Sequence, residues 1–378
     1  MSSSQSSPER FYSLDILRGI AALCVVFWHY QHFFFVGDSF PRNYNPIALP
    51  FYDILCFFFT YGSIAVNFFF SLSGFIFYWL YSKPVSERTI SAKEFFVRRF
   101  SRIYPLHLLT LLWVSLGQFA YHHFSKAYFI YQNNDPYHFV LSLFLATGWA
   151  PVKGESFNGP SWSISVEEFM YLLFFLFCRV LPVNMPITLG MVFYGFFLAS
   201  QTLPLVGEGI TSFFIGGCVY LVYKWLVERR QSKLICRILF SFTLLSWLFT
   251  AWALKANYYK LFFHSFFNYM ILFLIPLTIL GFALMEKERG SFGKRFAILG
   301  DISYSSYLLH FPLELTIATI LVVLGHGSES YGRSWFYSPF AFIGFIALVS
   351  FAGLASYRYF ERPVQRVIRK NWIKPCAK

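Results

Sequence analysis

Charged residues are scarce in this sequence. Lys, Arg, Asp and Glu make up 13% of the 378 residues, whereas 57% are hydrophobic and 23% are aromatic. Soluble domains carry about 25% charged residues, so this composition argues against a soluble globular protein. Apolar runs of roughly 20 residues recur along the chain, which excludes a single anchor on a soluble domain. The runs are too continuous for the alternating strands of a membrane barrel. We therefore predict an all-α polytopic membrane protein.

Cysteines are also few. The six show no C-x-x-C spacing and lie mostly inside apolar runs, at positions 24, 56, 178, 218, 236 and 376. This pattern favours small core residues over disulfides or a metal site, and we predict no bound metal. A cleavable signal peptide is also not expected, because the first apolar run is long, contains charges and lacks a small-residue cleavage site.

Acidic residues are the scarcer charge, which leaves a formal net charge of +13. The basic residues cluster between or beyond apolar runs, at 83–102, 224–237, 287–295 and 358–378. That distribution is typical of cytoplasmic loops, so we predict no nucleic-acid partner. We expect ten transmembrane helices with both termini cytoplasmic, near 12–36, 53–82, 104–124, 163–182, 186–203, 207–227, 235–255, 264–286, 297–324 and 336–360. This topology leaves six of the 31 Lys and Arg outside, namely Arg42, Lys126, Lys153, Lys255, Lys260 and Arg333.

The predicted organisation is one transmembrane domain over 12–366, between short cytoplasmic tails at 1–11 and 367–378. The segment HFVLSLFLATGWAP (138–151) is apolar but short for a span. Counting it as a span would also place the basic stretch 224–237 outside. We expect it to be a re-entrant or interfacial helix.

Three ionisable residues interrupt the first apolar run, SLDILRGIAALCVVFWHY: Asp15, Arg18 and His29. Arg18 and His29 are eleven residues apart and fall within about 20° of the same helix face, roughly 16 Å apart along the axis. Asp15 is three residues from Arg18 and shares the face. Ionisable groups in a membrane segment are costly and usually functional. The alternative is an interfacial Asp15–Arg18 pair and a hydrogen-bonded core histidine.

The fourth expected helix begins at GPSWSISVEEFMY (159–171), where Ser163 and Glu167 share a face. Glu167 lies roughly 6 Å from the outer end of its helix and His29 roughly 10 Å from the outer end of its own. At these depths a carboxylate would reach the imidazole and support it as a general base. The alternative is that Glu167 and Glu168 simply lie near the lipid headgroups.

Three arginines precede the third expected helix in SAKEFFVRRFSRIYPLH (91–107): Arg98, Arg99 and Arg102. Arg99 and Arg102 are three residues apart, a spacing that can present two guanidinium groups to one polyphosphate. Arginines beside a membrane are also common cytoplasmic anchors.

Taken in order, these motifs resemble those of the membrane acyltransferase-3 family, which acylates cell-surface carbohydrates. LDILRGIAALCVVFWH is similar to its R-x10-H signature, RRFSRIYP to its R-x-x-R segment and NGPSWSISVEE to its S-x-x-x-E segment. FFFSLSGF, SYSSYLLHFP and YFERPVQR resemble its second and closing helices. The likeness runs from residue 13 to 366. It implies a ten-helix domain, and some members add an extracellular esterase-like domain, which we do not expect in this chain.

The resemblance also implies an activity: transfer of an acetyl group from cytoplasmic acetyl-CoA to a hydroxyl of a surface glycan, such as lipopolysaccharide O antigen, at the inner membrane of a bacterium. His29 would be the catalytic histidine, as general base or acyl relay, with Arg18, Asp15 and Glu167 beside it. Arg99 and Arg102, helped by Arg98, would bind the CoA phosphates, and membrane lipids and the glycan or lipid-linked sugar are the other partners. A proton-coupled transporter is the alternative, since it needs the same buried ionisable residues.

Further candidates for the acceptor site are Ser163, Trp162, Asn158 and His310. Trp162 could stack on a sugar ring, and Asn158 could hydrogen-bond the acceptor or serve only in a turn. Oxyanion stabilisation could come from Ser163, Trp162 or Arg18. His310, in SYLLHFP, is equally consistent with a site or a core role.

Overall fold

The computed structural model describes residues 10–229, 233–255, 263–291, 293–325 and 332–373. Within these ranges the chain is helical and has no strand. Most of the expected terminal tails lie outside the described residues. The chain divides into two compact units, one made of Met1–Ala21, Ser63–Arg88 and Leu176–Asp301, the other of Ala22–Gly62, Thr89–Phe175 and Ile302–Lys378. Helices α1 and α6 contribute residues to both units.

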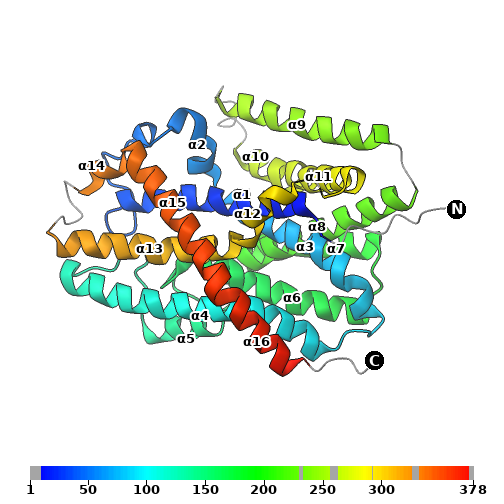
Figure 1. Ribbon diagram of the computed structural model, residues 1–378, viewed down its shortest axis with the longest axis horizontal. Coiled ribbons are helices and arrows are strands. Elements are labelled where there is room, and N and C mark those ends of the chain that lie inside the picture. Colours follow the sequence, from blue (N-terminus) through cyan, green and yellow to red (C-terminus); the bar gives the residue numbers. More distant parts are fainter. Residues whose placement is uncertain (1–9, 230–232, 256–262, 292, 326–331, 374–378) are drawn as a thin grey trace. The chain divides into compact units, whose positions relative to one another are not determined.

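In the first unit, α3, α7 and α8 lie side by side, and α9 lies along α11 (Figure 1). Helix α3 approaches α8 closely because glycines face the partner backbone: Gly74 packs on Phe213 and Gly216 on Ser71. Small residues are the usual means by which membrane helices come close together. The helices and turns of this unit are α1 (Tyr12–His29, first part), α3 (Ile64–Ser86), α7 (Met185–Gln201), α8 (Pro204–Glu228), α9 (Lys233–Lys255), α10 (Phe263–Tyr269), η5 (Met270–Leu274), α11 (Ile275–Arg289), η6 (Lys294–Phe296) and α12 (Ala297–Asp301).

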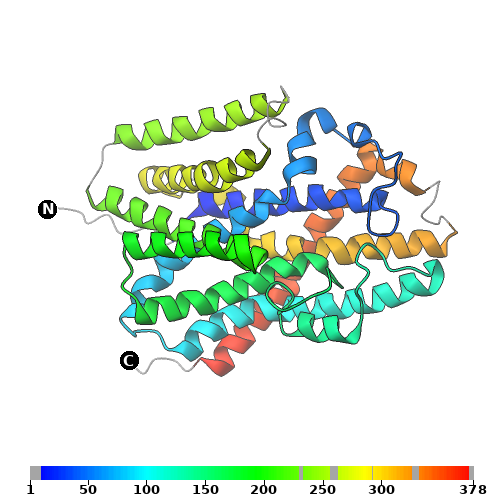
Figure 2. The ribbon, with the colours of Figure 1, turned by 180° about the vertical axis from the view of Figure 1, so that it is seen from behind.

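In the second unit, α13 runs beside α4 and is crossed by α15, as both views show (Figure 2). Two buried apolar clusters hold these helices, one centred on Phe311 and Leu315 of α13, the other on Tyr30 and Phe342. The helices and turns are η1 (Tyr30–Phe34), η2 (Pro46–Ala48), α2 (Tyr52–Tyr61), α4 (Ala92–Ser125), α5 (Pro136–Leu143), η3 (Gly159–Ser161), α6 (Trp162–Val180, most of it), α13 (Ser303–Val323), α14 (Gly332–Phe336), α15 (Pro339–Ala355), η7 (Ser356–Glu361) and α16 (Arg362–Trp372).

Eight helices in the described residues are long and apolar enough to cross a membrane. Two of the ten expected spans fall short: α6 carries Glu167, Glu168 and Arg179, and α7 has 17 residues. The count of ten and the orientation therefore remain predictions. The expected single span at 53–82 is wrong, because the chain forms α2 and α3 with a break at Gly62. A Cβ at Gly62 would lie 2.5 Å from the Cβ of Trp28, so only glycine allows this approach to α1.

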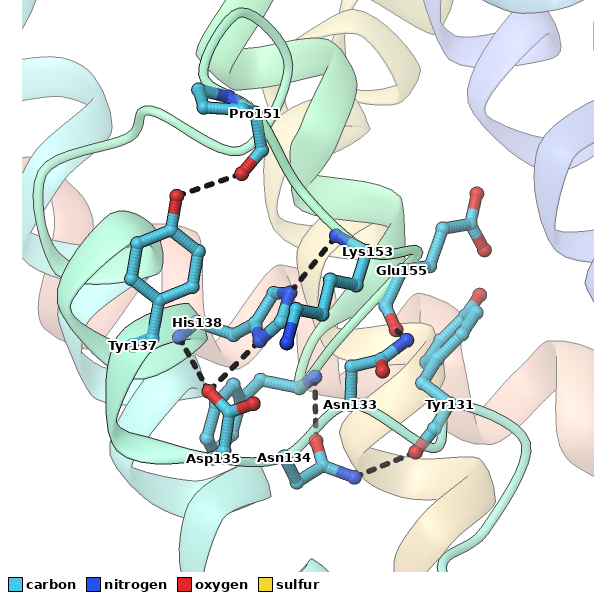
Figure 3. Close-up of polar contacts among 10 residues, drawn as sticks. Tyr131, Asn133, Asn134, Asp135, Tyr137, His138, Pro151, Lys153 and Glu155 are labelled. Carbon is cyan, nitrogen blue, oxygen red and sulfur yellow. Dashed lines mark hydrogen bonds and ion pairs between the residues drawn. The ribbon is translucent and has the colours of Figure 1, made fainter.

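The segment 126–161 folds upon itself around α5, whose eight residues are too few to span a membrane. Asp135 caps α5 by accepting from the His138 backbone N–H (2.9 Å), and it also binds His138 Nδ1 (2.8 Å; Figure 3). His138 Nε2 accepts from the Lys153 N–H at 3.3 Å, so Nδ1 carries the proton and donates to Asp135. Asn134 accepts from the Phe157 N–H at 2.7 Å. These bonds tie the two arms of the segment together.

Candidate active site

His29 is the last residue of α1 and is 6% exposed. Its Nδ1 lies 2.9 Å from the carbonyl oxygen of Val25, one turn back on the same helix. A carbonyl oxygen only accepts, so Nδ1 must carry the hydrogen of the neutral ring. The lone pair of the neutral imidazole is then on Nε2. This is the tautomer that a general base needs, and the helix itself holds it.

Two more imidazoles surround His29. The ring of His310, on α13, is 4.6 Å from that of His29, and the ring of His32, in η1, is 4.9 Å away. His32 Nδ1 is 2.9 Å from the Oε2 atom of Glu314, which is fully buried. His310, whose role the sequence leaves open, lies beside His29 in the structure. His32 and Glu314 were not predicted, although the spacing of His29 and His32, and of His310 and Glu314, marks both pairs as helical neighbours.

Glu167 does not pair with His29, contrary to expectation. Its Oε1 accepts a 2.6 Å hydrogen bond from the hydroxyl of Tyr171, one turn further along α6. Among the described residues, the ring of His29 contacts the Val25 carbonyl and its aromatic neighbours instead. Similar distances of His29 and Glu167 from the outer ends of their helices did not predict a contact. The carboxylate beside the histidines is that of Glu314 on α13.

Arg99 and Arg102 lie near a second group of polar side chains. The Arg99 guanidinium is 5.8 Å from the ring centre of Tyr171 and interacts electrostatically with Glu168. Arg102 interacts with Glu361 and with Tyr304. A positively charged pair with adjacent carboxylates can exchange those partners for a phosphate.

Arg98 differs from its two neighbours. Its Nε and Nη2 atoms bind one oxygen of Glu94, at 3.0 and 2.6 Å, one turn back on α4. Its carbonyl accepts from Arg369 of α16 at 3.2 Å. Arg98 thus has a local role in attaching the start of α4.

Helix α13 carries a polar stripe, which we define as Tyr304, Tyr307, His310 and Glu314. Their spacings of three, three and four residues keep them on one side of the helix. Tyr304 lies near Arg102, and His310 near His29. Six residues separate Tyr304 from His310, about 9 Å of helix rise. The stripe therefore connects the arginine region to the histidines within one unit.

The middle of the stripe holds a hydroxyl pair. Tyr307 and Ser163 hydroxyls are 2.7 Å apart, and both approach the Pro160 carbonyl, at 2.9 and 3.2 Å. Two hydroxyl hydrogens serve these three contacts, so one hydroxyl donates to the other and the second to the carbonyl. Trp162, half-buried, begins α6 beside this pair.

Asn158 supports the same helix. Pro312 has no N–H, so it cannot bond the carbonyl of Leu308 one turn back on α13. The Asn158 side chain donates to that carbonyl at 3.1 Å and is itself 1% exposed. This contact gives Asn158 a structural role, whereas binding of the acceptor by Asn158 stays a prediction.

Asp15 and Arg18 belong to the first unit. Asp15 binds Arg10 Nε at 2.5 Å and Arg18 Nη2 at 2.9 Å, and Arg10 also reaches Asp301 at 2.7 Å. Arg18 Nη2 donates to the carbonyl of Gly300 at 2.8 Å. Burial disfavours the charge of Arg10, but the two carboxylates outweigh it and raise its pKa. This network fastens the start of α1 to α12.

The described residues contain no group of three or more His, Cys, Asp or Glu arranged to hold a metal ion. The chemically distinctive groups described above are the Nε2 lone pair of His29 and the guanidinium groups of Arg99 and Arg102.

The chain is similar to several known proteins. A protein described as "Protein 2 in picA locus" of Rhizobium radiobacter is 39% identical over 108 residues, 29% of this chain and 46% of that protein. Acyltransferase MdmB of Streptomyces mycarofaciens is 35% identical over 174 residues, 45% of this chain and 40% of that protein. The chain thus spans less than half the length of either. The putative acetyltransferase ORF330 of Acidianus two-tailed virus is 25% identical over 320 residues, 82% of this chain and 85% of that protein.

No solved structure matches the chain significantly. The family described as "Acyltransferase domain" matches residues 11–360, nearly the whole sequence. With the helices long enough to span a membrane, this match shows that the chain belongs to the acyltransferase-3 family of membrane acyltransferases.

Proposed function

We propose that the protein is an O-acetyltransferase of the bacterial inner membrane. It moves an acetyl group from cytoplasmic acetyl-CoA to a hydroxyl of a cell-surface glycan, such as lipopolysaccharide O antigen. Membership of an acyltransferase family supports the reaction class. The observation that carries the proposal is the bond from His29 Nδ1 to the Val25 carbonyl, which leaves Nε2 as the base.

In this reaction His29 Nε2 takes the proton from the acceptor hydroxyl as its oxygen attacks the thioester carbonyl. The tetrahedral intermediate collapses, the carbon–sulfur bond breaks, and the thiolate of CoA receives the proton from His29. If the acetyl group instead rests on His29 between two half-reactions, the same nitrogen serves as the nucleophile. Either route needs a neutral His29 at the start.

The donor end of the site is assigned to Arg99 and Arg102, whose guanidinium groups suit the phosphates of CoA. The pantetheine arm would then follow the polar stripe of α13 toward His29. The hydroxyl pair of Ser163 and Tyr307 lies midway along that stripe; its two hydrogens are engaged with each other and with Pro160, so it offers oxygen lone pairs that can accept a hydrogen bond from the substrate. Glu168 beside Arg99 and Glu361 beside Arg102 hold the arginines in place when CoA is absent.

The first experiment measures acetyl transfer by purified protein in lipid nanodiscs, with acetyl-CoA and a surface-glycan fraction, read by mass spectrometry. We expect His29→Ala to lose at least about 100-fold in turnover, the lower range for a general base. A folded, inserted His29→Ala protein that turns over at a normal rate overturns the proposal.

The donor site has a matched control on its own helix. Arg99→Gln with Arg102→Gln should raise the KM for acetyl-CoA at least about tenfold, because two charge-assisted contacts are lost. Arg98→Gln removes one positive charge from the same part of α4 but leaves Arg99 and Arg102 in place, so its KM for acetyl-CoA should stay near that of the wild type. If Arg98→Gln raised the KM for acetyl-CoA as much as the changes at Arg99 and Arg102, the arginines would act only through their general positive charge.

A further inference from the structure

Glu314 is a buried carboxylate with one hydrogen-bond partner. Its Oε2 lies 2.9 Å from His32 Nδ1, while Oε1 is buried and has no hydrogen-bond partner among the described residues. Desolvating an ionised carboxylate is expensive unless a positive charge compensates it. Within the part of the chain that the structure describes, no Lys or Arg contacts it, so the imidazoles are the groups that can carry that charge.

The titratable groups around this carboxylate come from three elements and one loop. They are His29 of α1, His32 of η1, His310 and Tyr307 of α13, and Tyr131 of the segment 126–135. The ring of Tyr131 is 5.9 Å from that of His32, and the ring of Tyr307 is 5.8 Å from that of His310. The residues flanking Glu314 on α13 pack into the apolar clusters that α4 and α15 supply.

His310 adds a second constraint. It is fully buried, and neither ring nitrogen makes a hydrogen bond of normal geometry; the backbone carbonyls of Ser306 and Tyr307 lie close to the ring. Its ring is 4.6 Å from His29, so a proton placed on His29 has a poorly solvated imidazole beside it. A positive charge there needs a negative one close by. The ring of His32 lies between Glu314 and His29, which makes Glu314 a nearby carboxylate.

We propose that Glu314, held by His32, is the counter-charge that stabilises protonated His29 during transfer. This role rests on the proposed function. The proton passes from the acceptor oxygen to His29 Nε2 and then to the CoA sulfur, while Glu314 stays ionised and exchanges no atom. Glu314 and His32 are positioning residues, because neither takes part in the bonds that form and break.

Glu314→Gln is the direct test, because it keeps the shape and an acceptor for His32 but removes the charge. We expect kcat to fall at least about tenfold with an unchanged KM for acetyl-CoA. Without the anion, His29 loses its proton more readily. The acid limb of the profile of kcat/KM against pH, where His29 must be neutral, should move about one unit lower. A carboxylate with only a structural role would leave that limb in place.

A shorter matched pair, Glu314→Asp and Glu314→Asn, repeats the comparison at equal side-chain length. The Asp variant should keep the acid limb near its wild-type position, and the Asn variant should shift it downward. This pair decides the question if the Gln variant does not fold. An unshifted acid limb in both neutral variants overturns the counter-charge, provided that His29→Ala is inactive. An active His29→Ala protein instead removes the proposed function itself.

Discussion

The bond from Asn158 to the Leu308 carbonyl predicts a measurable coupling with Pro312. In Asn158→Ala the carbonyl that Pro312 leaves open loses its buried partner. A buried acceptor without a partner costs about 1–3 kcal/mol of the free energy of unfolding. In Pro312→Ala the new backbone N–H can bond Leu308 along the helix, so the carbonyl no longer depends on Asn158.

The double variant should therefore be more stable than the sum of the single effects predicts. We expect a coupling free energy of about 1–2 kcal/mol, since one buried hydrogen bond is needed in one background and dispensable in the other. Unfolding of the four proteins in mixed detergent micelles, followed by far-ultraviolet circular dichroism, gives the cycle. Independent sites add within about 0.3–0.5 kcal/mol, so a coupling below that range would refute the reasoning.

The same cycle separates a structural Asn158 from one that binds the acceptor. If Asn158 is structural, Asn158→Ala lowers the free energy of unfolding, and this loss is smaller in the Pro312→Ala background. An acceptor ligand would instead raise the KM for the glycan, with an unchanged free energy of unfolding in both backgrounds.

Two further predictions concern the scaffold. Gly216→Ala should lower the free energy of unfolding by about 1–3 kcal/mol, because the new methyl group meets the backbone of Ser71. Gly190→Ala is the control: its surroundings are open, so the free energy of unfolding should stay the same or rise by up to about 1 kcal/mol. Equal stabilities of the two variants would contradict the close approach of α8 to α3. Hydrogen bonds from the backbone N–H and ring of His138 hold the pKa of Asp135 below its ordinary value. Stabilisation by Asp135 is then fully present above about pH 4 and is lost as the pH falls through the lowered pKa. An acid-active protease should cleave Asp135→Ala faster than the wild type within residues 126–158. This difference in cleavage rate should shrink as the pH falls, and a difference that does not depend on pH would refute the role of the charge.

The helical fold could be predicted well, because apolar runs and basic clusters are local signals. The break at Gly62 could not, since it depends on the approach of a glycine to Trp28 on another helix. Likewise α4 begins at Ala92, well before the expected residue 104. The polar, arginine-rich residues before 104 are helical too, but apolar composition alone does not identify them as part of the helix.

The sequence selected candidate residues but could not predict which of them lie together in the fold. The tautomer of His29 needs the position of the Val25 carbonyl, and the carboxylate near it was expected from α6 but belongs to α13. Helical spacing predicts which residues share a face of one helix, but which other helix packs against that face depends on the tertiary structure. Glu167 and Glu314 each interrupt an otherwise apolar stretch, and the sequence alone does not show which of them approaches the histidines.

The polar stripe of α13 means that one helix sets both the distance and the angle between the arginine region and the histidines. Inserting one residue between Tyr304 and His310 would rotate the two ends by about 100° for a rise of only about 1.5 Å. Inserting four would nearly restore the angle and lengthen the separation by about 6 Å. If the proposed function is correct, the number of residues between Tyr304 and His310 determines the length of the acyl carrier that can reach from Arg102 to His29.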